Sequence, residues 1–473
     1  MIRFFALTIV SLAAVFGPVA AEAPTRRPNL LFIVTDDQRW DALGVVQREQ
    51  GKDARFPWFK TPNLDRLANE GARFRNAFVV HSLCSPSRAS FLSGQYGHKN
   101  GIIDNVTPFS KRAMNQAELL RKAGYHTAFI GKLHMDSQPE RYGFDHIASY
   151  TGQGLYTNST FLVNGKPERP PGWVDDIATD YAIQYMRTNT TEPWMMFLGY
   201  KAVHTPRTPP ARAQNRFAGE SVKVAKNANA MPTYGQGQLA LVEDVSPPYP
   251  EAKGDKGGTN RYLINYFRTL SAMDDNIGRI LAELDRLKLA EDTVIVFAGD
   301  NGYFLGEHGL GDKRAAYEDG MRIPLLMRYP RMVAKGTLID RMVLNIDLAP
   351  TFLDLAGVSI PKEMQGVSWL PLLKNSRSVP WRDAFMFVYA YEPPLPSTPA
   401  MVAVRTDAAK LIVYPGHDDW TEMFDLRSDP YEMKNLAHEP ARQDLLAELK
   451  KELAAQKERF GDPLSPPEIM PDK

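Results

Sequence analysis

Cysteine is almost absent from this chain of 473 residues, which contains only one, Cys84. A single cysteine has no partner within its own chain, so an intramolecular disulfide is excluded. The two signs of charge also nearly cancel, with 56 lysines and arginines against 55 aspartates and glutamates. A net charge of +1 gives no bulk attraction to nucleic acid or to an anionic membrane. Any anion must therefore be bound by a few cations in particular positions.

The chain also lacks an N-terminal hydrophobic run long enough to cross a membrane. An apolar run over residues 4–16 follows the positively charged Arg3. It is shorter than the roughly 20 residues that a membrane-spanning helix needs, and small residues come after it. This order is typical of a secretory signal peptide over residues 1–23, cleaved after Ala21 or Ala23, with an uncleaved anchor as the alternative. We therefore expect a periplasmic or secreted protein without a membrane span.

Short apolar runs alternate with helical patterns through most of the chain. Residues 29–35, 127–130, 194–200 and 293–298 have the unbroken apolar character of buried parallel strands. The longest helical pattern covers residues 261–287. Helices between buried strands predict an α/β domain with a doubly wound, mostly parallel sheet flanked by helices.

The C-terminal part has a different pattern, in which four short strands separated by turn residues precede an amphipathic helix at residues 443–460. The strands are expected at residues 385–391, 401–405, 411–414 and 422–426. This order predicts a small antiparallel sheet with one terminal helix. We place the catalytic α/β domain at residues 24–374 and the C-terminal subdomain at residues 375–473.

Residues 206–259 lack periodic apolar positions and are rich in proline, glycine, alanine and lysine. A connection of this length is usually a functional lid or a disordered segment. Because it directly follows His204, we expect a long substrate-facing loop, with a flexible insertion as the alternative.

The surroundings of Cys84 suggest chemistry at a helix N-terminus. The sequence Cys84-Ser85-Pro86-Ser87-Arg88 places proline where it suits the first turn of a helix. Arg88 is four residues beyond Cys84 and therefore lies on the same helix face. The free N–H groups of a helix N-terminus form a natural anion site. Cys84 is consequently a core thiol, a free nucleophile or a residue for covalent modification.

Acidic residues follow two of the predicted strands. Asp36 and Asp37 come after the first strand, and Asp300 with Asn301 comes after the last. The carboxyl ends of parallel strands meet at one edge of an α/β sheet, where such folds bind ligands. These side chains offer only oxygen ligands, which suit Ca²⁺ or Mg²⁺ better than zinc. For one aspartate pair taken alone, a helix cap or a turn is the alternative.

The pattern Cys-x-Pro-x-Arg, continued to Gly94, resembles the signature of type I sulfatases in the alkaline-phosphatase superfamily. In that family a maturation enzyme oxidises the cysteine to formylglycine, and the hydrated aldehyde is the nucleophile that attacks sulfur. The resemblance therefore implies this modification of Cys84. It also implies a metal site, most often occupied by Ca²⁺, with Mg²⁺ as the alternative. The ligands would be residue 84, Asp36, Asp37, Asp300 and Asn301.

Three further positions carry the same resemblance. Residues 131–134 are similar to the family's Gly-Lys-x-His signature, although Leu133 stands where an aromatic residue is common. His204 matches a family histidine, with Val203 in place of a frequent proline. Lys313 matches a second sulfate-binding lysine, whereas His308 is expected to be structural.

The resemblance implies a role for each of these side chains. The sulfate would be bound by Arg88, Lys132, His204 and Lys313. Asp300 would accept the proton of the nucleophile, and His204 or Lys313 would protonate the leaving alcohol. His134 would hydrogen-bond the formylglycine hydroxyl and help to eliminate sulfate.

Together these positions imply a sulfuric ester hydrolase acting on a sulfated oligosaccharide or polysaccharide. Residues 98–101, 143–145 and 152–154 are similar to exported bacterial glycan sulfatases, including N-acetylglucosamine-6-sulfatases. Sulfate esters of algal or host polysaccharides are alternative substrates. A phosphonate or phosphate monoester hydrolase of the same superfamily and a non-catalytic sulfated-glycan-binding protein are alternative functions. Asn301 favours the sulfatase, because phosphonate hydrolases tend to have histidine at that position.

Overall fold

The computed structural model describes residues 27–135, 142–234, 258–375, 378–392 and 398–465. The predicted signal peptide at residues 1–23 lies outside the described residues. Within them, no helix combines the length and the apolar character that crossing a membrane requires.

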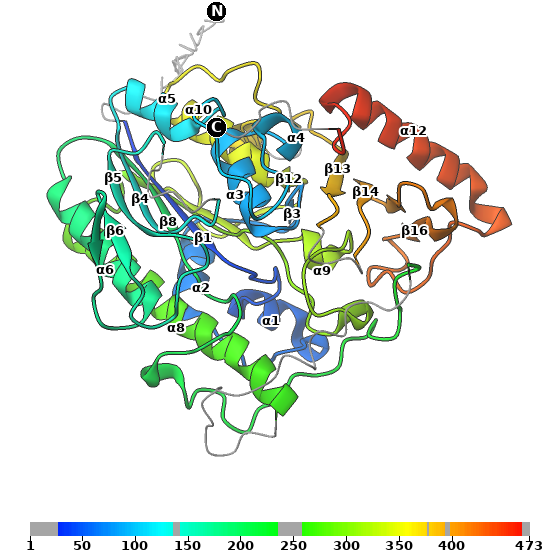
Figure 1. Cartoon of the computed structure of the whole chain (residues 1–473), viewed down its shortest axis with the longest axis horizontal. Coiled ribbons are helices and arrows are strands. Elements are labelled where there is room, and N and C mark those ends of the chain that lie inside the picture. Colours follow the sequence, from blue (N-terminus) through cyan, green and yellow to red (C-terminus); the bar gives the residue numbers. More distant parts are fainter. Residues whose placement is uncertain (1–26, 136–141, 235–257, 376–377, 393–397, 466–473) are drawn as a thin grey trace, which may run out of the picture.

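A ten-stranded sheet runs through the larger part of the molecule (Figure 1), in the order β11-β2-β10-β9-β1-β8-β4-β5-β6-β7. Its five central strands are parallel to one another, and the unbroken apolar sequences predict four of them, all except β5. These are β9 (Thr293–Gly299), β1 (Asn29–Thr35), β8 (Trp194–Gly199), β4 (His126–Lys132) and β5 (His146–Tyr150). The prediction of a mostly parallel sheet is confirmed.

The outer strands are short and partly antiparallel. They are β10 (Leu325–Arg328), β2 (Ala72–Phe74) and β11 (Thr337–Ile339) at one edge, and β6 (Phe161–Val163) and β7 (Lys166–Glu168) at the other. A separate parallel pair joins β3 (Ala77–Phe78) to β12 (Val343–Leu344). The sequence patterns predict none of these strands, because two to four residues show too little periodicity.

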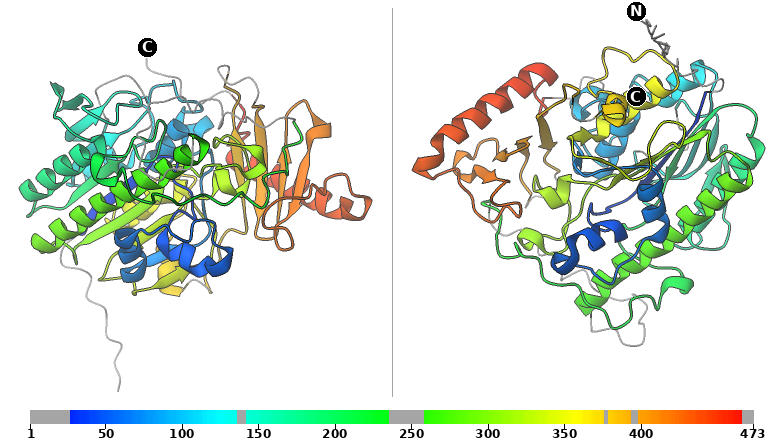
Figure 2. Two further views of the ribbon diagram at one scale, coloured as in Figure 1. Left: turned by 90° about the horizontal axis from the view of Figure 1, so that it is seen from below. Right: turned by 180° about the vertical axis from the view of Figure 1, so that it is seen from behind.

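The side chains of β1 alternate between two cores, as a sheet covered on both faces requires. Leu31 and Ile33 belong to one core, and Leu30, Phe32 and Val34 to the other. The first core contains side chains of α2 (Pro62–Glu70), α6 (Val174–Thr188) and α8 (Gly258–Arg286). The second contains side chains of α3 (Cys84–Ser93), α5 (Gln116–Lys122) and α10 (Leu348–Leu355). Figure 2 shows these helices from two further directions.

Four short helices complete the described part of this unit. They are α1 (Gly44–Gln50), α4 (Gly97–Asn100), α9 (Glu318–Met321) and α11 (Leu370–Asn375).

The C-terminal part folds as the sequence predicts, into a four-stranded antiparallel sheet with one terminal helix (Figures 1 and 2). The elements are β13 (Ala384–Tyr389), β14 (Met401–Thr406), β15 (Ala409–Val413), β16 (Glu422–Asp425) and α12 (Gln443–Phe460). Leu449 and Leu453 of α12 share a core with this sheet, and Phe78 and Tyr317 of the α/β unit enter the same core. The two parts therefore pack together, and the division at residues 374 and 375 stays a prediction.

Of the predicted long loop, the structure describes residues 206–234. Arg212 and Arg216 form ion pairs with Asp275 of α8. Farther along, the Thr233 hydroxyl donates a hydrogen bond to Glu422 of β16. This part of the segment therefore connects the surface of α8 to the C-terminal sheet, while its role toward a substrate stays a prediction.

Candidate active site

The carboxyl ends of four neighbouring parallel strands bring the predicted site residues together. In the sheet these strands lie in the order β9, β1, β8, β4. Asp300 and Asn301 follow β9, Asp36 and Asp37 follow β1, Lys201 and His204 follow β8, and Lys132 and His134 end β4 or follow it. Open α/β sheets bind their ligands at this edge.

Three buried carboxylates form the centre of the site. Oxygen atoms of Asp36, Asp37 and Asp300 lie within 4.8 Å of one another. The backbone N–H of Asp37 donates to Asp300 Oδ1 at 3.0 Å, and Asn301 Nδ2 donates to Asp37 Oδ1 at 2.7 Å. Burial raises the pKa of Asp37, although Lys313 opposes the shift.

The side-chain oxygen of Asn301, Oδ1, is buried and has no hydrogen-bond donor facing it among the described residues. A buried hydrogen-bond acceptor that has no donor reduces the stability of the folded protein. Three carboxylates and one unpartnered amide oxygen are a ligand set that fits Ca²⁺ or Mg²⁺. The residues present therefore fit a divalent cation.

Cys84 is the first residue of α3 and is fully buried beside this cluster. Its Sγ lies 3.4 Å from Asp36 Oδ1 and 3.0 Å from Lys313 Nζ. Burial raises the pKa of the Cys84 thiol to about 12, although Lys313 opposes this shift. The unmodified side chain is therefore a neutral thiol near pH 7.

Three buried cations surround the carboxylates, and they are basic side chains that the sequence resemblance assigns to the sulfate. Arg88 Nε donates to Asp300 Oδ2 at 2.8 Å. Lys132 pairs with Asp36, and Lys313 pairs with Asp37. Burial and the nearby Lys201 lower the pKa of Lys132. The pKa of Lys313 is raised despite its burial, because Asp37 stabilises the ammonium.

Both predicted histidines lie at the same edge, His134 buried and His204 half-buried, and both are held neutral. Burial, reinforced by Lys132 and neighbouring cations, lowers the pKa of His134 and of His204. His204 Nδ1 lies 2.7 Å from the Thr205 carbonyl oxygen, which can only accept a hydrogen bond. The proton of neutral His204 is therefore on Nδ1, and its Nε2 has a free lone pair.

Sequence reasoning missed two residues of this site, Lys201 and Gln153. The buried Lys201 interacts electrostatically with Cys84, and burial lowers its pKa to about 8. Gln153 accepts a hydrogen bond from Lys132 Nζ through its side-chain oxygen at 2.6 Å. The glycines on both sides of Gln153 were a visible signal for a special backbone position, whereas Lys201 was only the second residue after a buried strand.

His308 has the structural surroundings that the sequence suggests. Its Nδ1 hydrogen-bonds the Ala230 carbonyl at 2.7 Å, and its Nε2 accepts from Asn227 at 3.0 Å. Its ring stacks on Tyr317 with a centroid distance of 3.8 Å. Both ring nitrogens are thus occupied by protein groups.

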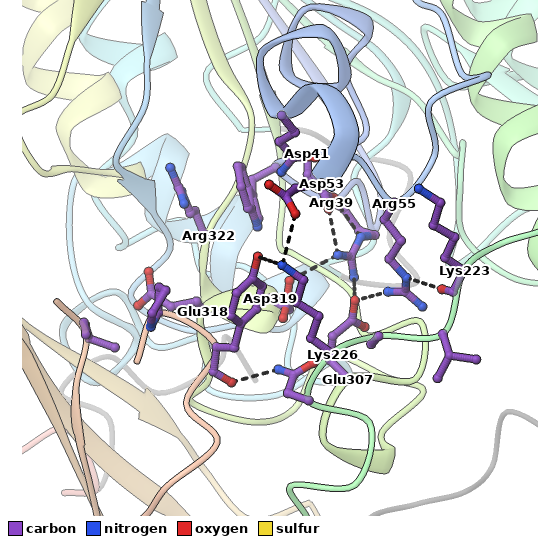
Figure 3. A pocket seen from close by; sticks show the side chains of 18 of the residues that line it. Arg39, Asp41, Asp53, Arg55, Lys223, Lys226, Glu307, Glu318, Asp319 and Arg322 are labelled. Atoms are coloured by element: carbon purple, nitrogen blue, oxygen red, sulfur yellow. Dashed lines mark hydrogen bonds and ion pairs between the residues drawn. The ribbon is translucent and has the colours of Figure 1, made fainter. Parts of the chain in front are cut away.

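A separate cavity of about 330 Å³ lies between the α/β unit and the C-terminal sheet (Figure 3). Its wall contains a network of buried ion pairs, with Arg39 bound to Asp41 at 2.8 Å and to Glu307 at 2.9 Å. Arg55 binds the same Glu307 carboxylate. None of the predicted site residues lines this cavity.

A profile of the family described as "Sulfatase" matches residues 28–358. The chain belongs to the sulfatase family. It is thus a sulfuric ester hydrolase, and the resemblance seen in the sequence is confirmed. A second profile, "N-sulphoglucosamine sulphohydrolase, C-terminal", matches residues 306–459 of this sulfatase.

Relatives of this sulfatase include enzymes named for glycan substrates. It is 34% identical to an N-acetylglucosamine-6-O-sulfatase of Bacteroides thetaiotaomicron, over 91% of this chain and 86% of the relative. It is 29% identical to the N-acetylglucosamine-6-sulfatase of Homo sapiens, over 91% of this chain and 85% of the relative.

Solved structures show the same fold. One, in complex with its substrate D-glucosamine-2-N,6-O-disulfate, has a TM-score of 0.82 and 32% identity, covering 94% of this chain and 100% of the other. The phosphonate monoester hydrolase of Agrobacterium radiobacter has a TM-score of 0.74 and 20% identity, covering 92% and 96% of the two chains. The second likeness concerns the fold alone.

Proposed function

We propose that this sulfatase removes a 6-O-sulfate group from glucosamine or N-acetylglucosamine residues of a sulfated glycan. The observation that carries the proposal is the grouping of Cys84 with three buried carboxylates and several buried cations at one edge of the sheet. The glycan sulfatases among its relatives support the choice of substrate. An exported enzyme, periplasmic or secreted, fits a substrate of this size.

The proposed cation is Ca²⁺, with Mg²⁺ as the alternative. Asp36, Asp37, Asp300, Asn301 and residue 84 would hold it, because the unpartnered Asn301 Oδ1 completes a cluster that offers mainly oxygen. When bound, the cation would supply positive charge that polarises a sulfate oxygen.

The neutral thiol of Cys84 supports its conversion by a maturation enzyme. With a pKa of about 12, the unmodified side chain is a poor nucleophile near pH 7. Formylglycine at position 84, after addition of water to its aldehyde, would supply a hydroxyl nucleophile and a second hydroxyl that allows sulfate to leave by elimination, which restores the aldehyde. Asp300, which adds to the negative charge near Cys84, is the proposed acceptor of the first proton.

The cations around residue 84 are the proposed sulfate-binding groups. Arg88 and Lys132 are buried and form ion pairs with the carboxylates, so a single sulfate ester would enter a site with basic groups on several sides. Lys313 is the favoured proton donor to the leaving oxygen. The alternative donor, neutral His204, carries its proton on Nδ1, where the Thr205 carbonyl accepts it.

Two measurements on one preparation test this function. The protein is produced with a formylglycine-generating enzyme, and mass spectrometry of the Cys84 peptide measures the fraction of aldehyde. The same sample is then assayed on 6-O-sulfated N-acetylglucosamine, N-sulfated glucosamine, galactose 6-sulfate and an aryl phosphonate. We expect an aldehyde at position 84 and the highest kcat/KM on the 6-O-sulfated glucosamine compound.

Each other result points to a different alternative. A preference for the N-sulfate or for galactose would overturn the proposed substrate, and a preference for the phosphonate would favour the other hydrolase class. An unmodified thiol in a host that matures a control sulfatase, together with glycan binding but no turnover, would favour the binding protein.

A further inference from the structure

Gln153 reaches the proposed active site on a loop that glycine makes possible. The loop connects β5 to β6, and Gly152 and Gly154 flank Gln153 with φ angles of 56° and 60°. A Cβ atom on Gly154 would lie 2.5 Å from the ring of Tyr150, so the loop can approach this closely only with glycine there. The side chain of Gln153 is thereby placed between Lys132 and His134.

The contact with Lys132 determines which way the carboxamide of Gln153 faces. Lys132 Nζ forms an ion pair with Asp36, and an ammonium group in such a pair has donors and no acceptor, so the atom 2.6 Å from it is the carboxamide oxygen. The NH₂ group therefore faces His134 Nδ1, at 3.5 Å. Since this NH₂ group can only donate, Nδ1 must accept. The proton of neutral His134 then lies on Nε2.

The loop that carries Gln153 is itself attached to the end of β8. Lys201 Nζ donates to the Gln153 carbonyl oxygen at 2.9 Å and lies 5.0 Å from the centre of the Tyr156 ring. The Tyr156 hydroxyl donates to the His204 carbonyl oxygen at 2.6 Å. These contacts explain how a loop residue can hold a fixed orientation next to His134.

We propose that Gln153 is a positioning residue whose carboxamide, oriented by Lys132, keeps His134 as an Nε2–H hydrogen-bond donor. The consequence for turnover rests on the proposed function, in which His134 acts on the group at position 84. His134 then enters the reaction as a donor, and it can accept a proton on Nε2 only after its tautomer has changed.

The tautomer can be measured without any turnover, by NMR of the ¹⁵N-histidine-labelled protein. The chain has nine histidines, and the spectrum of a His134→Asn variant assigns the signals of His134. In the wild type we expect a proton on Nε2 and a free lone pair on Nδ1. In Gln153→Glu the carboxylate can still bind Lys132 but can only accept from His134, so the proton should move to Nδ1. In Gln153→Leu both tautomers should be present.

A second amide–histidine pair provides a matched control at a distance from the site. Asn164 Oδ1 accepts from the Ile147 N–H at 2.8 Å, so its NH₂ group faces His146 Nδ1 at 3.4 Å. Asn164→Asp should therefore change the signals of His146 and leave kcat and the signals of His134 as they are. A wild-type His134 with its proton on Nδ1, or no change in Gln153→Glu, would overturn the proposal.

Measurements of kcat and KM then separate the effect of the His134 tautomer from the effect of the negative charge added in Gln153→Glu. Mutation of a residue that hydrogen-bonds a metal-ligating histidine typically lowers metal affinity or activity by about 10–100-fold. By analogy, we expect kcat to fall by about this factor in Gln153→Glu and by less in Gln153→Leu. The added negative charge should raise KM in the glutamate variant only. Equal losses of kcat in the two variants, or full kcat with a reversed tautomer, would contradict a positioning role. If the wild type releases no sulfate, the proposed function fails while the NMR result still decides the tautomer.

Discussion

Two buried clusters of charge lie within a few residues of the end of β1, and they differ in how completely the protein pairs them. In the cluster beside the cavity of Figure 3, Arg39 binds Asp41 and Glu307, and Arg55 also binds Glu307. Although burial opposes it, these two arginines lower the pKa of Glu307. Its charged form is therefore stabilised by the protein alone.

The cluster around Cys84 is different, because it leaves a buried polar atom, Asn301 Oδ1, without a partner among the described residues. Buried charge normally has to be paired and hydrogen-bonded. The comparison teaches that burial of charge alone does not identify a functional site, and that the unpartnered Asn301 Oδ1 is what distinguishes the cluster around Cys84 from the cluster around Glu307.

The largest expected effect comes from removing the proposed nucleophile of the cluster around Cys84. Cys84→Ala should lower kcat/KM by at least about 10⁴-fold, as the loss of a covalent nucleophile does in other hydrolases. The helix α3 should still form, so circular dichroism should match that of the wild type. Sulfate release at the wild-type rate would show that residue 84 is not the nucleophile.

Removal of the cation should have the next largest effect. Dialysis against a chelator is expected to abolish most sulfate release, and Ca²⁺ at 100 times its Kd should stabilise the fold by about 2.7 kcal/mol relative to the metal-free protein. Metal analysis, kcat and Tm are measured on the same samples. A chelated protein that holds no metal and keeps full activity would contradict the proposed metal site.

The unmodified Cys84 thiol should react slowly with alkylating reagents, because it is buried and protonated near neutral pH. Since its pKa is about 12, the thiolate fraction at pH 7 is roughly 1 in 10⁵, and it rises tenfold with each pH unit up to that pKa. Protein made without the maturation enzyme should therefore be alkylated at Cys84 very slowly near neutral pH and faster as the pH rises. Rapid alkylation at pH 7 would mean that the thiol is accessible or ionised in solution.

The sequence predicts the charged residues at the centre of the cluster around Cys84 better than it predicts the neighbouring side chains that orient those residues. Asp36, Lys132 and Asp300 end or follow buried strands, and parallel strands bring their carboxyl ends to one edge. The flanking glycines indicate a special backbone position at Gln153, but which side chains it meets depends on how the loop between β5 and β6 folds back, and no local pattern predicts that. The outer strands escape prediction for a similar reason, because tertiary pairing and not periodicity defines them.

The paired cluster allows the converse experiment, in which stability changes and activity does not. Glu307→Gln keeps the shape of the side chain but leaves Arg39 and Arg55 without their shared carboxylate. Breaking a buried pair in this way costs about 3–5 kcal/mol, so Tm should fall by several degrees. Because no role in the reaction is proposed for Glu307, kcat/KM should stay within about threefold of the wild type at 25 °C, a change of less than about 1 kcal/mol.

The smallest effect is expected where charge is paired at the surface. Asp285 binds Arg66 at 3.0 Å, and both side chains are well exposed. Exposed ion pairs contribute about 0–1 kcal/mol, so Asp285→Asn should leave both Tm and kcat/KM close to the wild-type values. It is the matched control for Glu307→Gln, since both substitutions turn a carboxylate into an amide. Equal losses of Tm in the two variants would show that burial and shared pairing are not what distinguishes the Glu307 cluster.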